Sequence, residues 1–228
     1  MFYDETKTIN ACDDDPTLIF EILKEDLGEL VDKILSRKTF DYSVTDENGN
    51  DIMMKLLKKG YYDIVLNHMK DNRWDVNHQN NDGDTFAHIL VSIDYQKVID
   101  IIKQLMKNKE FTPNIRNNEG ETILDKSINN AYIYTTTKIL SDERFNSIGI
   151  FSFKKLYDTY VKSNNFGRYT RINNLEMILD NLEDKEVAPQ VKEIIEKIKN
   201  NLGIIKEEVL KDNRTDSMDL IVNTAIAG

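Results

Sequence analysis

One unit recurs along this chain, and that recurrence limits the folds open to it more than any other feature. Turn glycines mark the unit: Gly83 follows Gly49 by 34 residues (83−49 = 34), and Gly120 follows Gly83 by 37 (120−83 = 37). Each glycine lies in a run rich in Asn, Asp and Glu. Such runs form tight turns because glycine accepts a positive φ without steric penalty.

Two further landmarks keep the same phase. A residue with a helix-capping oxygen follows each glycine by two positions: Asp51, Thr85 and Thr122. Thr17 fits one step earlier, since 51−17 = 34. An aromatic residue closes each unit: Phe40, Trp74, Phe111 and Phe145. Periods of this size indicate helical repeats, in which each unit needs neighbours to bury its apolar face. The periodicity of the aromatic residues predicts packing between repeats instead of a partner-binding row.

The pattern predicts an all-α chain of stacked helix-turn-helix repeats. Four repeats are expected, at residues 14–40, 41–74, 75–111 and 112–145. Their helices should lie near 51–59 and 61–70, 85–92 and 95–107, and 122–130 and 132–141. The longer third step should lengthen the second helix of its repeat or the loop that follows.

The ends of the chain depart from the pattern. Residues 1–13 show no periodicity and are expected to form an N-terminal tail. Residues 146–184 read as a divergent fifth repeat or cap, and 185–228 as C-terminal helices. The segment from Met218 to Gly228 echoes the segment from Asn50 to Gly60, so it is either a truncated repeat or an ordinary amphipathic tail helix.

The run Asp82-Gly83-Asp84-Thr85-Phe86-Ala87-His88 resembles the ankyrin-repeat signature, in which a turn Gly precedes Thr-Pro-Leu-His-x-Ala. Gly60 falls where that family places Gly between its two helices. The chain departs from the family at the Pro position, which holds Phe86, Ile52 and Ile123, and at the His position, where only His88 is retained. The resemblance covers residues 14–145. It implies an ankyrin-like solenoid with short β-hairpin-like loops between helix pairs and a helical C-terminal cap. It also implies that Thr85 and His88 lock their turn and have no catalytic role.

The resemblance further implies a protein or peptide partner, held in a concave groove of hairpin tips and first helices. The positions that match the family's variable sites are Glu47, Asn48, Asn50, Lys58, Lys59, Asn81, Asp82, Asp84, Ser92, Ile93, Asn118, Glu119, Glu121, Asn129 and Asn130. This set is polar and mostly acidic, so the partner is expected to bring Lys or Arg. The alternative is that the tips are acidic because turns favour Asn, Asp and Gly.

Composition narrows the function classes. The net charge of −10 and the pI near 4.9 argue against nucleic acid as a partner. The single cysteine, Cys12, cannot form an internal disulfide. No apolar run approaches the roughly 18 residues of a membrane span, and the first residues lack a secretory pattern. We expect a cytoplasmic protein with no membrane contact and no cofactor.

No motif predicts catalysis or metal binding. His68, His78 and His88 are ten residues apart, whereas two ligands on one helix face need a spacing of three or four. An EF-hand loop that starts at Asp46 would need Glu at position twelve, which is Leu57. We therefore expect a non-enzymatic interaction module. The alternative is a host-directed effector or an enzyme whose activity lies in residues 146–228.

Overall fold

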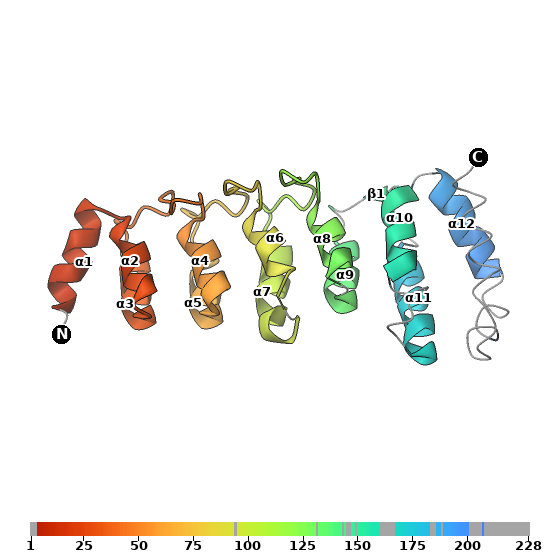
Figure 1. The fold of residues 1–228 in the computed structure, drawn as a ribbon, viewed down its shortest axis with the longest axis horizontal. Coiled ribbons are helices and arrows are strands. Elements are labelled where there is room, and N and C mark those ends of the chain that lie inside the picture. The colour runs from red at the N-terminus through yellow and green to blue at the C-terminus, as the bar shows by residue number, and fades with distance from the viewer. Residues whose placement is uncertain are drawn as a thin grey trace. The chain divides into compact units, whose positions relative to one another are not determined.

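A computed structural model shows a mostly helical protein (Figure 1). It describes residues 4–93, 95–130, 132–142, 144, 147–148, 150–159, 167–182, 186–187, 189–200 and 207. The chain divides into two compact units, Met1–Ile123 and Leu124–Gly228. Among the described residues, no helix is both long and apolar enough to cross a membrane.

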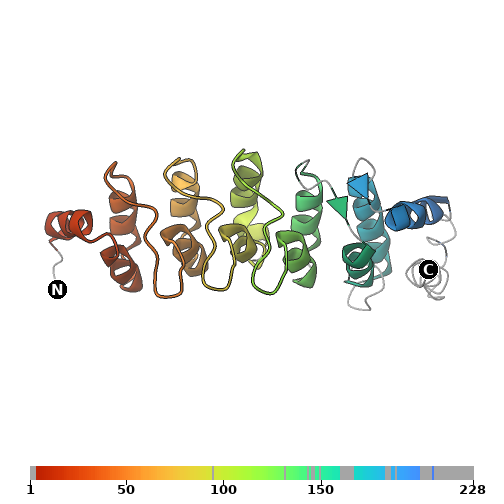
Figure 2. The ribbon, with the colours of Figure 1, turned by 90° about the horizontal axis from the view of Figure 1, so that it is seen from above.

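The first unit is built from a leading helix and three helix pairs. Its elements are α1 (Glu5–Asp14), α2 (Leu18–Lys24), α3 (Gly28–Leu35), α4 (Ile52–Lys59), α5 (Tyr62–His68), α6 (Phe86–Leu90) and α7 (Tyr95–Lys107). Within each pair the two helices pack together, and α2, α4 and α6 pack in sequence, as do α3, α5 and α7. Figures 1 and 2 show these pairs side by side, with the loops between pairs at one end of the helices.

The second unit is also helical. Its elements are α8 (Ile123–Asn129), α9 (Ile133–Leu140), β1 (Ser147–Ile148), α10 (Ile150–Tyr157), α11 (Arg168–Leu182), β2 (Glu186–Val187) and α12 (Pro189–Asn200). The strands form one short parallel pair, in which Ser147 lies opposite Glu186. Helix α11 packs on α9, and α12 packs on α10.

The helices predicted for residues 41–142 are all present, with ends shifted by a few residues. The longer spacing between Gly83 and Gly120 coincides with a longer second helix, since α7 has 13 residues and α5 has 7. Residues 218–228, predicted as a truncated repeat or a tail helix, lie outside the described residues.

Local chemistry explains where α4 begins and ends. The Asp51 side chain accepts the Met54 N–H at 2.7 Å, which caps the first turn. Gly60 ends the helix with φ of +82°, the left-handed conformation that glycine adopts most easily. Between them Ile52, Met53 and Leu56 are fully buried. The Asp51 cap, the buried apolar face and Gly60 therefore determine where this helix begins and ends.

Residues 1–13, predicted as a tail, contain most of helix α1, which packs on α2 and α3. Asp4 caps the helix by accepting the Lys7 N–H. At the other end the Asp13 carboxylate accepts hydrogen bonds from Arg37 and from the Thr39 hydroxyl. Hydrophobic periodicity does not indicate this helix because its residues are mainly polar.

Aromatic side chains lie buried where the loops between helix pairs begin. Phe40, Trp74 and Phe111 are all at least nine-tenths buried. Trp74 packs edge-on against Phe86 of the next helix pair, with ring centroids 5.0 Å apart. The predicted packing is confirmed for Trp74, and the burial of Phe40 and Phe111 agrees with it, whereas Phe145 lies outside the described residues.

Candidate functional site at the loop tips

Three loop tips carry most of the predicted partner-binding residues, and each is held by the same internal bonds. The Oδ1 atom of the residue that opens the tip accepts two backbone N–H groups, from the residues two and four positions later. The opening residues are Asp46, Asn80 and Asn117, and the distances lie between 2.9 and 3.1 Å. The turn glycines that follow, Gly49, Gly83 and Gly120, all have positive φ, as predicted.

Neighbouring tips are bonded to one another along the first unit. The Asn81 N–H donates to the Asn48 carbonyl at 3.0 Å, and the Asn118 N–H donates to the Asp82 carbonyl at 3.0 Å. The Asn118 carboxamide also donates to the Asn81 carbonyl, at 2.9 Å. The three tips therefore form a ladder in which each rung repeats the bonds of the one before.

Carboxamides add a second line of bonds to this ladder. Asn80 donates to the Asn50 side chain at 3.0 Å, and Asn117 donates to the Asp84 carboxylate at 2.8 Å. The tip that begins at Asp46 has no carboxamide at this position. Asp46 pairs instead with Lys55 at 2.9 Å. Burial works against ionisation of Asp46, but the bonds from Lys55 and Asn50 outweigh it and hold the pKa of its carboxyl below the ordinary value.

Close approach of consecutive tips explains two of the glycines. A Cβ atom on Gly49 would lie 2.5 Å from Asn81 Oδ1, and one on Gly83 would lie 2.7 Å from the Asn118 backbone nitrogen. Around Gly120, no described heavy atom lies within 4 Å of the corresponding position. Only a residue without a side chain fits the first two positions.

His88 joins α6 to the loop that precedes α8. The Thr85 hydroxyl accepts the His88 N–H at 3.4 Å, and the Thr85 N–H donates to His88 Nδ1 at 3.2 Å. Since Nδ1 accepts, the ring proton is on Nε2, which donates to the Glu121 carbonyl at 3.0 Å. The ring is completely buried. The predicted locking role of Thr85 and His88 is confirmed.

Most of the fifteen predicted partner-binding residues are accessible. The exposed ones are Glu47, Asn48, Lys58, Lys59, Asn81, Asp82, Ser92, Asn118, Glu119, Asn129 and Asn130. Asp84, Ile93 and Glu121 are half-buried. Asn50 differs from the rest, because it is only 3% exposed and its amide bonds to Asp46, Lys58 and Asn80. Its side chain is used within the tips.

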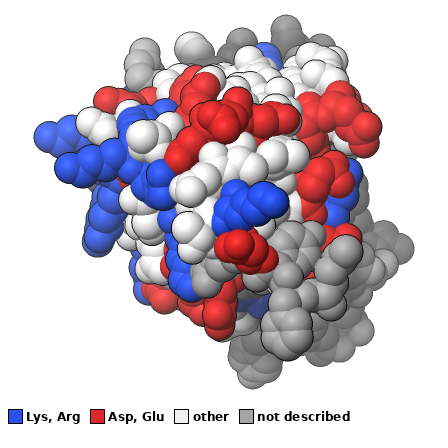
Figure 3. Space-filling view, turned by 90° about the vertical axis from the view of Figure 1, so that its left-hand side faces the viewer, with Lys and Arg blue, Asp and Glu red and all other residues white. Residues whose placement is uncertain are grey.

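The charge of the surface is mixed. Figure 3 shows the α1 end of the first unit, where acidic side chains lie along the upper edge and basic side chains gather at one side. Lys59, one of the predicted contacts, caps the end of α2 by donating to the Leu23 carbonyl at 2.7 Å and also pairs with Asp26. Some of the basic side chains, such as Lys59, therefore stabilise the fold.

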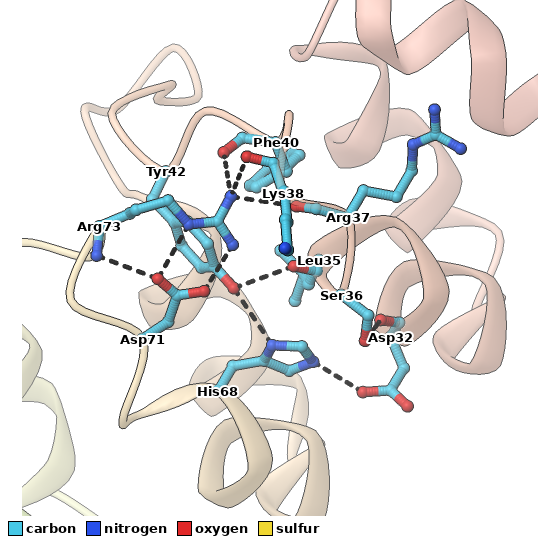
Figure 4. A network of polar contacts seen from close by, with 10 residues as sticks. All are labelled: Asp32, Leu35, Ser36, Arg37, Lys38, Phe40, Tyr42, His68, Asp71 and Arg73. Carbon is cyan, nitrogen blue, oxygen red and sulfur yellow. Dashed lines mark hydrogen bonds and ion pairs between the residues drawn. The ribbon is translucent and has the colours of Figure 1, made fainter.

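A polar network away from the tips escaped prediction from the sequence (Figure 4). His68 Nε2 lies 2.8 Å from the Asp32 carboxylate, and Nδ1 lies 3.1 Å from the Tyr42 hydroxyl. The Arg73 guanidinium lies over the Tyr42 ring and binds the Asp71 carboxylate. Asp32 lies 36 residues and Tyr42 26 residues before His68 in the chain, so no local motif could indicate the network.

The contacts of this network support a role in stabilising the fold and not in catalysis. The Tyr42 hydroxyl is buried, also reaches the Leu35 carbonyl, and has a pKa raised above its ordinary value by burial. A nucleophile needs the opposite shift and access to substrate. The network links α3 to α5, and Arg73 extends it by donating to the Phe40 carbonyl at 3.0 Å.

The three histidines and the cysteine do not converge. His68 binds Asp32 and Tyr42, His78 lies 2.8 Å from the Gly49 carbonyl, and His88 binds within its own turn. No group of three metal-binding side chains occurs among the residues that the structure describes. Cys12 is buried, and burial raises the pKa of its thiol, which is not the environment of an activated cysteine.

No protein-family model matches the chain, and no curated protein matches it.

Proposed function

We propose that this chain is a non-enzymatic protein-interaction module, and that residues 14–145 form an ankyrin-like solenoid that binds a protein or peptide. The binding surface is the concave groove formed by the loop tips and the first helices. The observation that carries this proposal is the ladder of three tips, because it combines a rigid backbone with outward polar side chains. Rigid loops on a repeated scaffold reduce the entropy lost on binding.

The accessible charge in the first unit indicates the kind of partner. Glu47, Asp82 and Glu119 are exposed, one on each tip. The ladder bonds use the backbone of these residues, so their carboxylates can face a ligand without loosening the tips. Carboxylates spaced along a line favour a partner that presents Lys or Arg, with association weakened by salt.

The contacts also support a non-enzymatic role. Every histidine ring takes part in bonds that hold the fold, and the buried Tyr42 is a poor nucleophile. An enzymatic site in 146–228 would need titratable side chains such as those of Asp158, Arg168, Tyr169 and Glu176. Asp158 and Glu176 are half-buried, and the side chains of Arg168 and Tyr169 lie outside the described set. No observation favours the enzyme or effector alternative.

Affinity capture from an extract of the source organism tests the proposal. The test variant changes Glu47, Asp82 and Glu119 to Lys. The control variant changes Glu29, Asp63 and Asp100 to Lys, because these acids are also exposed but lie on the second helices α3, α5 and α7. Both variants change the net charge equally. We expect the wild type and the control to retain the same protein, and the tip variant to lose it. Retention by the tip variant would show that the groove assignment is wrong.

A further inference from the structure

The ladder of tips has one face that the first two tips use to bind the next tip, and among the described residues nothing binds this face of the third tip. On the first and second tips, this face binds the next tip in the chain through two carbonyl oxygens and a glycine. On the third tip the equivalent groups belong to Asn118, Glu119 and Gly120, all of which are exposed. Among the described residues, nothing donates to the carbonyl oxygens of Asn118 and Glu119.

The first two junctions define what such a face binds. Each time, the incoming turn places a backbone N–H on one carbonyl, at 3.0 Å in both junctions. A carboxamide of the same turn reaches the neighbouring carbonyl, at 3.1 Å from Asn81 and 2.9 Å from Asn118. A second carboxamide, from Asn80 or Asn117, bonds to the side chain after the glycine. Both incoming turns thus begin with two consecutive asparagines.

We infer that the open face at Asn118, Glu119 and Gly120 is a second interaction surface, which binds a turn that begins with two asparagines on a partner protein. The docking mode resembles the addition of a strand to a sheet edge, where backbone groups supply affinity and side chains supply selectivity. The surface shares Asn118 and Glu119 with the groove of the proposed function, but it uses their backbone carbonyls and the groove uses their side chains, so it does not depend on that proposal.

The composition of the first tip argues against a second copy of this chain as the occupant. The tips that begin with Asn-Asn are already docked within the first unit. The remaining tip begins with Asp46 and Glu47, whose carboxylates accept hydrogen bonds and cannot donate them. Their approach to Glu119 would also bring like charges together. The ends of the ladder are therefore mismatched for head-to-tail association, and a carboxamide-bearing turn from another protein fits better.

Titration of the unmodified protein with a cyclic peptide tests this inference. The peptide carries the sequence of residues 114–122, which already docks on a tip within the chain. Backbone amide chemical shifts report where it binds. We expect concentration-dependent shifts centred on Glu119 and Gly120. A control peptide with Asn117→Asp and Asn118→Asp keeps the acceptor oxygen that Asp46 uses to hold its own turn, but it loses both carboxamide donors.

We expect the control peptide to bind at least about tenfold more weakly than the Asn-Asn peptide, because it loses two hydrogen bonds. The titrations run at physiological salt, which limits the effect of the added charge. Equal binding of the two peptides would overturn the inference, as would shifts centred on Asn48 or Asp82 or no shifts at millimolar peptide. None of these outcomes depends on the capture experiment, which changes the protein and leaves the peptide aside.

Discussion

The helix pair α4–α5 and the helix pair α6–α7 stabilise the start of their first helices with different chemistry. In the first pair, one oxygen of Asp51 caps α4 and the other accepts the Trp74 indole N–H at 3.0 Å. In the second pair, Thr85 has a single oxygen, and Phe111 has no donor. The His88 ring supplies the additional bonds there. Different residues thus satisfy the donors and acceptors of the two pairs, so the residues of one set can be exchanged only together.

Truncation of the buried rings Trp74 and Phe111 should give the largest loss of stability among these tests. Trp74→Ala and Phe111→Ala each remove a buried ring and should lower the free energy of unfolding by about 3–5 kcal/mol. Trp74→Ala should be the more severe change, because it also leaves an Asp51 oxygen without its donor. Urea unfolding followed by circular dichroism measures both. An unchanged midpoint for Trp74→Ala would contradict the packing role, and Trp74→Phe separates the ring from its N–H.

Substitution of the turn glycines tests the contact between consecutive loop tips, which both helix pairs share. Gly83→Ala places a methyl group 2.7 Å from the Asn118 backbone, so the tips must separate, whereas Gly120→Ala meets no described atom. Both changes carry the penalty of about 1–2 kcal/mol for a positive φ. We expect the loss for Gly83→Ala to exceed that for Gly120→Ala by at least about 1 kcal/mol. Equal losses in urea unfolding would show that tip contact adds nothing to the cost of the backbone conformation.

The buried carboxyl of Asp51 should make the stability around α4 depend on pH, whereas the Thr85 hydroxyl that caps α6 does not titrate. Burial raises the pKa of this carboxyl above its unfolded value, although the Met54 and Trp74 N–H groups oppose the shift. A raised folded pKa adds stability below the unfolded pKa of about 3.9, and that stability is lost as pH rises through the folded value.

Comparison of wild type with Asp51→Asn isolates this effect, which we expect to be the smallest of the three. The stability of wild type relative to the variant should fall from pH 3 to pH 7. Asp46 and Asp71, whose pKa values are lowered, change stability in the opposite sense in both proteins and cancel. Fluorescence of the single tryptophan, Trp74, follows unfolding next to the carboxyl. A difference that is independent of pH would contradict the assignment.

Features of the fold that depend on local chemistry could be predicted from the sequence. The glycine turns and the caps at Asp51 and Thr85 were correct because each is decided within a few residues. Helix α1 was missed because its few apolar residues give no stripe, and only contacts with α2 and α3 explain it. The network of Asp32, Tyr42 and His68 was missed because it joins residues far apart in the chain.

The candidate site shows the same limit. Asn50 was expected at the partner surface because it lies in a polar tip, yet neighbouring tips enclose it. Asn81 and Asn118 are predicted as partner-binding positions, and no role is predicted for Asn80 or Asn117. The carboxamides of all four bind the preceding tip. A sequence shows which residues favour a turn, but it does not show which of their donors the neighbouring turn accepts. Whether the exposed tip residues bind a partner stays a prediction.

Hydrogen exchange at the ladder amides should report the local opening of single junctions between tips. The Asn81 and Asn118 amide protons are each held by a carbonyl on the preceding tip, at exposed positions where a free amide would exchange rapidly with solvent. Each proton is therefore released when one particular junction opens, even if the helices on both sides stay folded. The two exchange rates read the opening free energies of two adjacent junctions separately, so the order in which the first unit comes apart can be followed without altering a residue.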